Sequence, residues 1–429
     1  MTTYTKKLPY GVWDFTRGWV FLAIALLALI ALGIYAYSIQ LIEGEVVTGM
    51  RNLGTMGGAT WGLYISFLIY FIGLSFTGIS IAAMIRLLGL EKIKPIARMA
   101  EALTVIALIL GALVVIVDLG QPARALVNLF RYARPGSPFF GTFTLVIAGY
   151  LFASQVYLYL DGRRDAAILA KIPGKLQGFF RIWSAGYKDT PAEQERHHQT
   201  SFWLAIAIVP LLITAHSTLG FVFGLQVGRP GWFSSLQAPE FVALAGVSGI
   251  GFLIIIAAIL RKVLNTEEIL DIDVFKWLSD FLMVLIVVYL YFLVVEWLTI
   301  TYTAQSHELI IANAMYTGDY AWAYWLTVAA LVIPLLLLGW QFIFKRYQMA
   351  WIVISGFLVN VAAIVKRYLI VVPSQTHGKL LPYEIGSYTP TWIEYSVVLG
   401  LFALGTLLYI SFIKIFPIME VIEIVEGGE

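Results

Sequence analysis

The sequence lacks cysteine and has few charged residues. Of its 429 residues, 60% are hydrophobic and only 13% are charged. Without cysteine the chain itself can hold neither a disulfide nor a cysteine-ligated iron–sulfur cluster. Soluble domains carry roughly 25% charged residues, so a mean hydropathy of +0.84 excludes a soluble protein and leaves no soluble domain of useful size. The composition predicts an all-α integral membrane protein.

Histidine is also scarce, which limits the metal and cofactor chemistry. Only His216, among five histidines, falls inside a long apolar run. A transmembrane b-type haem commonly needs two axial histidines at similar depth on facing helices, so we expect no haem. No phosphate-binding loop, dinucleotide-binding fingerprint, metal-ligand spacing or nucleic-acid-binding motif is present.

What the sequence does contain is long apolar runs. A bilayer core requires about 20 apolar residues per helix, and ten runs meet this length: 18–38, 61–86, 97–117, 138–160, 201–223, 239–261, 274–300, 321–344, 349–372 and 394–416. Most of the 28 Lys and Arg lie in the two tails and in alternate loops, a bias that marks the cytoplasmic side. We therefore expect ten transmembrane helices with both termini in the cytoplasm.

Acidic residues recur at matching depths in two of these runs. Glu101 and Asp118 lie near the inner and outer ends of the third run, and Asp280 and Glu296 lie at the corresponding ends of the seventh. This recurrence, four runs apart, favours parallel repeats. It predicts a single polytopic domain (1–429) with two four-helix bundles, 61–223 and 239–372, and with the first and last helices peripheral.

The two inner acids have two interpretations of equal weight. Glu101 follows Arg98 and Asp280 follows Lys276 within about one helical turn, so each acid could form an ordinary interfacial ion pair. Charged groups inside a membrane also mark proton relays. Glu101 and Asp280 are therefore candidates for a proton path.

The outer acids are stronger candidates for a binding site. Gly120 and Pro122 follow Asp118 and must end its helix, which turns polar groups towards a pocket. Arg124 could simply neutralise Asp118, or the two could together position the oxygen of a quinone. Glu296 lies among aromatic residues, Tyr302 included, and His216 falls in the outer third of the fifth run.

Two series of motifs resemble a known family. The segments Asp118-Leu119-Gly120-Gln121-Pro122-Ala123-Arg124 and Ser137-Pro138-Phe139-Phe140-Gly141 resemble the signature of the NrfD/PsrC family, the membrane subunits of polysulfide reductase-type complexes. Further segments resemble its ten-helix branch, which includes DsrP, HybB and the alternative complex III subunits: Arg98-Met99-Ala100-Glu101-Ala102, Ala215-His216-Ser217, Pro230-Gly231-Trp232, Tyr320-Ala321-Trp322-Ala323-Tyr324-Trp325, Lys366-Arg367-Tyr368 and Tyr388-Thr389-Pro390-Thr391-Trp392.

The resemblance implies a subunit without its own redox centre, in the cell membrane of a bacterium or archaeon. Such a subunit exchanges electrons between a quinone, here menaquinone, and a ferredoxin-like iron–sulfur subunit docked on the outer face within a larger redox complex. The implied quinone-binding residues are Asp118, Gln121, Arg124, His216, Trp232, Glu296 and Tyr302, with Asp118, His216 and Glu296 as proton-exchanging groups. Gln121 and Gly141 depart from the residues common in relatives, so the proton ligand at the quinone stays open.

Two other classes of function remain as alternatives. A proton-coupled transporter or channel would also use buried acids in repeated bundles, although its site is expected near the midplane. A non-catalytic anchor of a periplasmic complex would tolerate neutral residues at Asp118 and His216. Loss of quinone turnover in such variants would favour the quinone-reactive subunit.

Overall fold

The computed structural model describes residues 8–50, 59–132, 134, 136–137, 143–377 and 387–421, and these residues form helices and no strands. Ten helical segments are long and apolar enough to cross a membrane, which confirms the predicted fold class. They are α1 (Arg17–Glu43), α2 (Leu63–Leu74) with α3 (Phe76–Leu88), α4 (Ala97–Asp118), α6 (Phe143–Leu169), α8 (Pro191–Gly224), α9 (Gln237–Val263), α10 (Ile272–Thr303), α12 (Ala321–Phe344), α13 (Met349–Val371) and α15 (Trp392–Ile415).

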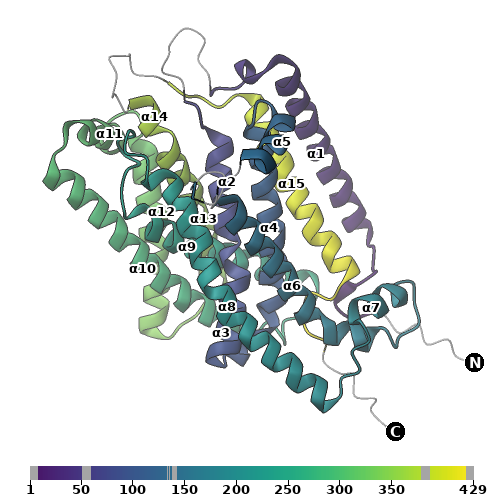
Figure 1. The fold of residues 1–429 in the computed structure, drawn as a ribbon. Coiled ribbons are helices and arrows are strands. Elements are labelled where there is room, and N and C mark those ends of the chain that lie inside the picture. Colours follow the sequence, from purple (N-terminus) through teal and green to yellow (C-terminus); the bar gives the residue numbers. More distant parts are fainter. Residues whose placement is uncertain are drawn as a thin grey trace, which may run out of the picture.

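The described ends of the chain lie at the same end of the helix assembly. The hydroxyl of Tyr10 donates a hydrogen bond to the carbonyl of Glu420, at 3.1 Å. We call this end the near face, which the charge bias predicts to be cytoplasmic, and the opposite end the far face. Figure 1 shows the short helices α5 (Pro122–Tyr132), α11 (Ser306–Tyr316) and α14 (Pro373–His377) at the far face and α7 (Gln177–Ser184) at the near face.

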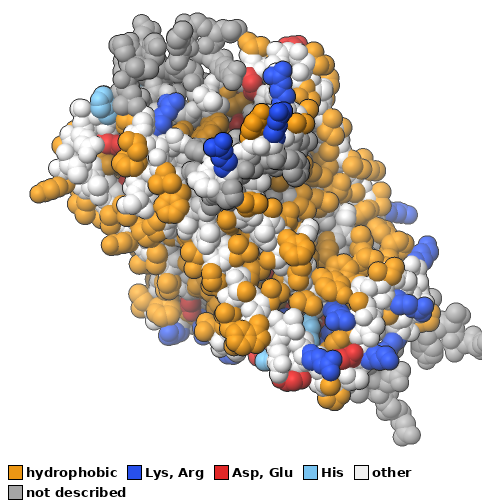
Figure 2. All heavy atoms as spheres, in the orientation of Figure 1, with side chains coloured by type: hydrophobic (Ala, Val, Ile, Leu, Met, Phe, Trp, Pro, Cys, Tyr) orange, Lys and Arg blue, Asp and Glu red, His pale blue; other side chains and the backbone are white. Residues whose placement is uncertain are grey.

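The surface has the distribution of side chains that a membrane requires. Hydrophobic side chains cover the middle of the face in Figure 2, while Lys and Arg side chains gather towards its two ends. Many large hydrophobic residues in the middle of the membrane helices are exposed, Leu336 and Phe152 among them. An aqueous protein would bury such residues, but lipid chains solvate them without cost.

We call the helices from α2 to α8 the first group, those from α9 to α13 the second group, and α1 with α15 the terminal pair. In the first group α2 and α3 contact α4, and α8 contacts α3 and α6. In the second group α9 and α12 each contact both α10 and α13. Contacts of α2 and α8 with α9 join the groups, and α1 packs along α15, which also contacts α4. Asp118 therefore belongs to the first group and Glu296 to the second.

The second transmembrane helix is broken at Ser75, between α2 and α3. The carbonyl of Ser75 accepts hydrogen bonds from Tyr150 (2.7 Å) and Thr104 (2.8 Å) of neighbouring helices. The Thr104 hydroxyl also accepts from the backbone N–H of Gly78, at 2.8 Å. These side chains satisfy backbone groups that the break frees from the helical pattern, which is the condition for irregular backbone inside a membrane.

Candidate functional site

Asp118 is the last residue of α4 and lies at the far face. Its helix ends there, and α5 starts at Pro122 after a short turn, as the sequence predicts. The Oδ1 atom of Asp118 is buried and has no hydrogen-bond partner among the described residues. A buried polar atom without a partner costs free energy, so this oxygen is available to a ligand that brings a donor.

Two further carboxylates lie around Asp118. Glu45, in the short helix η2 (Glu45–Val47), and Glu394, in the first turn of α15, are close enough for their charges to act on Asp118. The hydroxyl of Tyr64 donates to Oε1 of Gln40 at 2.8 Å, and the amide of Gln40 donates to both Glu45 and the carbonyl of Val117, each at 3.1 Å. We call Gln40, Glu45, Tyr64, Asp118 and Glu394 the far-face cluster.

Tyr388 fixes one edge of the far-face cluster. Its hydroxyl donates to Oε1 of Glu394 and accepts from the backbone N–H of Leu63, at 2.6 Å. Burial and the neighbouring Glu394 carboxylate raise the pKa of Tyr388, so its hydroxyl stays protonated and keeps donating. Glu394 also accepts from the backbone N–H of Gly49, at 2.8 Å. These hydrogen bonds fix the carboxylate of Glu394, whereas no hydrogen bond from a described residue fixes Oδ1 of Asp118.

Three of the predicted quinone-binding residues are exposed. Gln121 and Arg124 lie on the surface at the start of α5, and no ion pair joins Arg124 to Asp118 within the described part of the chain. Tyr302 is 92% exposed near the end of α10. The interpretation that Arg124 neutralises Asp118 has no support from this geometry.

Glu296 belongs to a second cluster, separate from Asp118. Nζ of Lys366 in α13 lies 2.8 Å from Oε2 of Glu296 and 3.3 Å from Oε1 of Glu240. The hydroxyl of Tyr289 donates to the same Glu240 oxygen at 3.0 Å. Lys366 and Glu240 are almost fully buried, whereas Glu296 is partly exposed. We call Glu240, Tyr289, Glu296 and Lys366 the lysine cluster.

His216 lies against the helix break rather than in a pocket with the acids. It is 1% exposed, with Nδ1 2.8 Å from the carbonyl of Leu212 and Nε2 3.0 Å from the carbonyl of Ile72. The rings of Phe76 and Tyr150 pack on it edge to face. Both ring nitrogens thus face carbonyl oxygens of the protein, a geometry that joins α8 to the end of α2.

We expect a structural effect from replacing His216 with leucine. The variant loses the bridge from α8 to Ile72, so the free energy of unfolding should fall by about 1–3 kcal/mol. Thermal unfolding of the purified protein measures this loss. Quinone-linked turnover per folded molecule should stay within about threefold of the parent; a fall of a hundredfold would instead assign His216 a part in the reaction.

Trp232 is buried in an aromatic group between the two helix groups. Its Nε1 donates to the carbonyl of Ile370 at 2.6 Å, and its ring stacks on Trp61 with centroids 5.6 Å apart. The ring of Phe223 meets it edge to face. These contacts hold the loop between α8 and α9 against α13. The indole N–H of Trp232 already donates to the carbonyl of Ile370, so it is not free to bind a ligand.

Glu101 lies deep in the first group with both carboxylate oxygens buried and without a hydrogen-bond partner among the described residues. Arg98 pairs instead with Asp165 at 2.7 Å and Asp161 at 3.1 Å, so the expected pairing of Arg98 with Glu101 is not observed. A cavity of about 220 Å³ at the near face is lined by Arg86, Arg98 and Asp161, whose charges act on Glu101.

Asp280 lies near the start of α10 and is half-buried. Both of its carboxylate oxygens accept from the hydroxyl of Tyr347, at 3.0 and 3.1 Å. Lys276 lies over the ring of Tyr347, and no ion pair within 4 Å joins it to Asp280 in the described residues. Asp280 and Glu101 thus differ, because Asp280 has a hydrogen-bond partner, whereas Glu101 has none in the part of the chain that the structure describes.

The predicted binding residues differ in their surroundings, and their grouping into one site stays a prediction. Asp118, His216 and Glu296 each have their own surroundings, and no hydrogen bond or ion pair described here links any two of them. Pro138–Gly141 of the signature motif lie outside the described residues. Sequence reasoning missed Gln40, Glu45, Tyr64, Glu240, Lys366 and Glu394 as site residues. Glu240 and Lys366 carried a usable signal, since each is a charge within a long apolar run.

Comparison with known proteins agrees with this architecture. The family model described as "Polysulphide reductase, NrfD" matches residues 51–377. A putative membrane subunit of the dimethyl sulfoxide reductase of Halobacterium salinarum is 28% identical over 98% of this chain and 95% of its own length. A selenate reductase subunit of Mesobacillus selenatarsenatis is 24% identical over 90% of this chain and 92% of its own length.

The name of a third relative includes a substrate, menaquinol. The Hdr-like menaquinol oxidoreductase integral membrane subunit of Archaeoglobus fulgidus is 26% identical over 94% of this chain and 95% of its own. The family match covers most of the chain and all helices from α2 to α14. This protein belongs to the NrfD family.

Proposed function

We propose that this protein is the quinone-reactive membrane subunit of a respiratory oxidoreductase complex, with a menaquinone-type substrate. The chain belongs with the membrane subunits of multi-subunit oxidoreductases, as its family and relatives indicate. The name of the Archaeoglobus relative supports menaquinol in particular. The observation that carries the proposal is the buried Oδ1 of Asp118 in the far-face cluster, which has no hydrogen-bond partner within the described ranges of the chain.

The far-face cluster has the groups that quinone chemistry requires. A quinone takes up two protons when it is reduced and releases them when it is oxidised. Asp118 can accept or donate a proton at Oδ1, to which no described residue donates a hydrogen bond. Tyr64 and Gln40 form a fixed chain of hydrogen bonds beside it, and this chain also engages Glu45. The chain thus keeps the surrounding polar groups in one arrangement while Asp118 exchanges its proton.

Electrons must leave or enter through another subunit, since this chain has no cysteine for a cluster. We propose that a ferredoxin-like iron–sulfur subunit docks on the far face above α5. Arg124, Arg131 and Arg134 are exposed there and would meet acidic side chains of such a partner. The alternative of a solitary transporter predicts no such partner.

Purification in mild detergent tests the proposal. We expect menaquinone in the organic extract and a cysteine-rich iron–sulfur subunit among the co-purifying proteins, both identified by mass spectrometry. A chain that purifies with neither would contradict the proposal and favour transport.

We further propose that Glu101 belongs to a proton path from the near face. Its unpartnered carboxylate lies close to charged residues that line the near-face cavity. In proteoliposomes, Glu101→Gln should abolish quinone-linked proton translocation, measured with a pH-sensitive dye, and keep at least a third of the electron transfer. Glu91→Gln, at an exposed acid of the near face, is the control and should change neither. Unchanged translocation in Glu101→Gln would contradict the path.

A further inference from the structure

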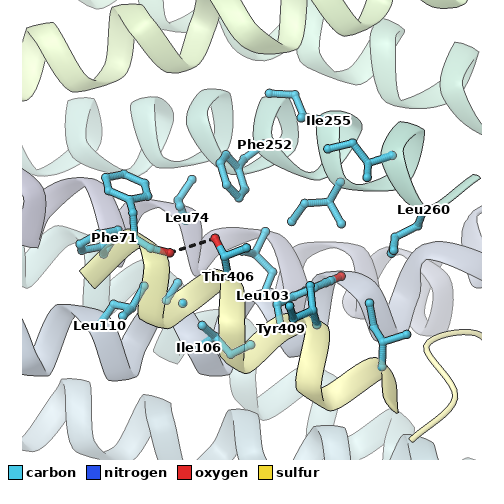
Figure 3. A pocket seen from close by; sticks show the side chains of 17 residues that line it. Phe71, Leu74, Leu103, Ile106, Leu110, Phe252, Ile255, Leu260, Thr406 and Tyr409 are labelled. Atoms are coloured by element: carbon cyan, nitrogen blue, oxygen red, sulfur yellow. Dashed lines mark hydrogen bonds between the residues drawn. The ribbon is translucent and has the colours of Figure 1, made fainter. Parts of the chain in front are cut away.

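A cavity of about 230 Å³ lies between α2, α4, α9 and α15, below the far-face cluster. Figure 3 shows apolar side chains from these helices, Leu103, Leu110 and Phe252 among them, arranged around it. Ile259 is 55% exposed and Thr406 is also exposed, so the rim faces the lipid side of the helix assembly. We call this space the lateral cavity.

The lateral cavity offers no free polar group to a ligand. Its two hydroxyls are already used, because Thr406 donates to the carbonyl of Phe402 at 2.9 Å and Tyr409 to that of Met99 at 3.1 Å. The other lining side chains are apolar. A ligand with polar atoms would lose its hydrogen bonds to water without replacement here, so the chemistry fits an aliphatic chain.

Three of the four helices that line the lateral cavity, α2, α4 and α15, also carry residues of the far-face cluster. On α4, Leu110 lies eight residues before Asp118, which is about 12 Å at 1.5 Å per residue. On α15, Phe402 lies about 12 Å below Glu394, and on α2, Phe71 lies about 10 Å below Tyr64. A chain attached to a head group in the far-face cluster needs to extend only about 10–12 Å along these three helices to reach the cavity.

Charge argues against a phospholipid as the occupant. At the far end of the path Glu45, Asp118 and Glu394 would repel a phosphate. At the near end two of the basic residues are engaged, since Arg261 pairs with Glu267 and donates to the carbonyl of Leu270, and Lys414 donates to the carbonyl of Gly11. A neutral quinone head suits the carboxylates better than an anionic lipid head.

We propose that the lateral cavity holds the isoprenoid tail of the quinone whose head group binds at the far-face cluster. This inference rests on the proposed function. It gives the tail a site of its own on the protein, so that tail length contributes to affinity.

A photolabelling experiment on the purified complex tests the inference. The probe is a menaquinone analogue with a diazirine at the end of its tail, and peptide mass spectrometry locates the labelled residues. Labels are expected in α4, α9 and α15 around the lateral cavity. Thr406→Phe fills the cavity and should reduce this labelling at least fivefold.

Thr299→Phe is the matched control. Thr299 is also exposed on a membrane helix and also donates to the carbonyl four residues earlier, but it does not line the lateral cavity. Its labelling should equal that of the parent. Two results would overturn the inference. One is labelling of Thr406→Phe equal to that of the parent. The other is that Thr406→Phe loses a bound phospholipid and keeps its label.

Competition by other quinones distinguishes failure of the tail site from failure of the proposed function. Menadione, which has the head group without the tail, should reduce labelling if the head site exists. Labelling that menadione suppresses but that lies on other helices overturns the tail site alone. Labelling that neither menadione nor excess long-tailed menaquinone suppresses overturns the tail site together with the proposed function.

Discussion

Replacement of Asp118 with asparagine is expected to slow quinol oxidation by the assembled complex by about 100- to 10,000-fold, the range that a positioned acid or base contributes. Asparagine has nearly the same shape but cannot exchange a proton. Since Oδ1 of Asp118 has no hydrogen-bond partner among the described residues, the substitution breaks no observed bond to that atom. Stopped-flow measurement of quinol oxidation in the purified complex gives the rate.

The control for this variant is Glu43→Gln. Glu43 is an exposed acid at the far end of α1, so the substitution removes the same charge from the same face without touching the cluster. Its rate should equal that of the parent, and both variants should keep their bound subunits. A normal rate in Asp118→Asn would contradict the part of Asp118 in proton exchange and would favour a subunit that only anchors the complex.

The ten spans could be predicted from the sequence because the thickness of the bilayer sets a physical minimum on each apolar run. The end of α4 was equally accessible, since Gly120 and Pro122 break helices regardless of their surroundings. The start of α8 at Pro191 was missed by about ten residues, because its first turns are polar and extend beyond the apolar run.

The break at Ser75 could not be predicted. Residues 63–88 contain no proline, and the break depends on Thr104 and Tyr150 from other helices. The same limit applies to Arg98, whose nearest acid in the sequence is Glu101 but whose partners are Asp161 and Asp165 of α6. Contacts between distant residues decide these cases, and local spacing carries no information about them.

The candidate site could be predicted only in part. Sequence reasoning singled out the intramembrane acids, and Oδ1 of Asp118 is buried without a hydrogen-bond partner among the residues that the structure describes. The shared site of Asp118 and Glu296 stays a prediction. The structure pairs Glu296 with Lys366 of α13, a partner that the sequence could not identify without knowing which helices face each other.

The lysine cluster leads to the second large expected effect. Replacement of Lys366 with methionine removes the only cation within 4 Å of both Glu240 and Glu296 among the described ion pairs. Breaking a buried pair leaves an uncompensated charge and costs about 3–5 kcal/mol. The variant should therefore unfold at a clearly lower temperature, as measured by thermal denaturation in detergent.

A double variant identifies the cause of this loss. In Lys366→Met with Glu240→Gln, the more buried carboxylate no longer carries a charge that needs a partner, so at least half of the lost stability should return. Lys262→Met, at an exposed lysine near the end of α9, controls for loss of a positive charge and should unfold as the parent does.

Activity in the double variant then decides what the lysine cluster is for. If the lysine cluster only holds α9, α10 and α13 together, the double variant with its restored stability should oxidise quinol at a rate close to that of the parent. If its stability returns but its rate stays at least tenfold low, Lys366 and Glu240 take part in proton transfer. That second result would join the lysine cluster to the far-face cluster as two parts of one reaction path.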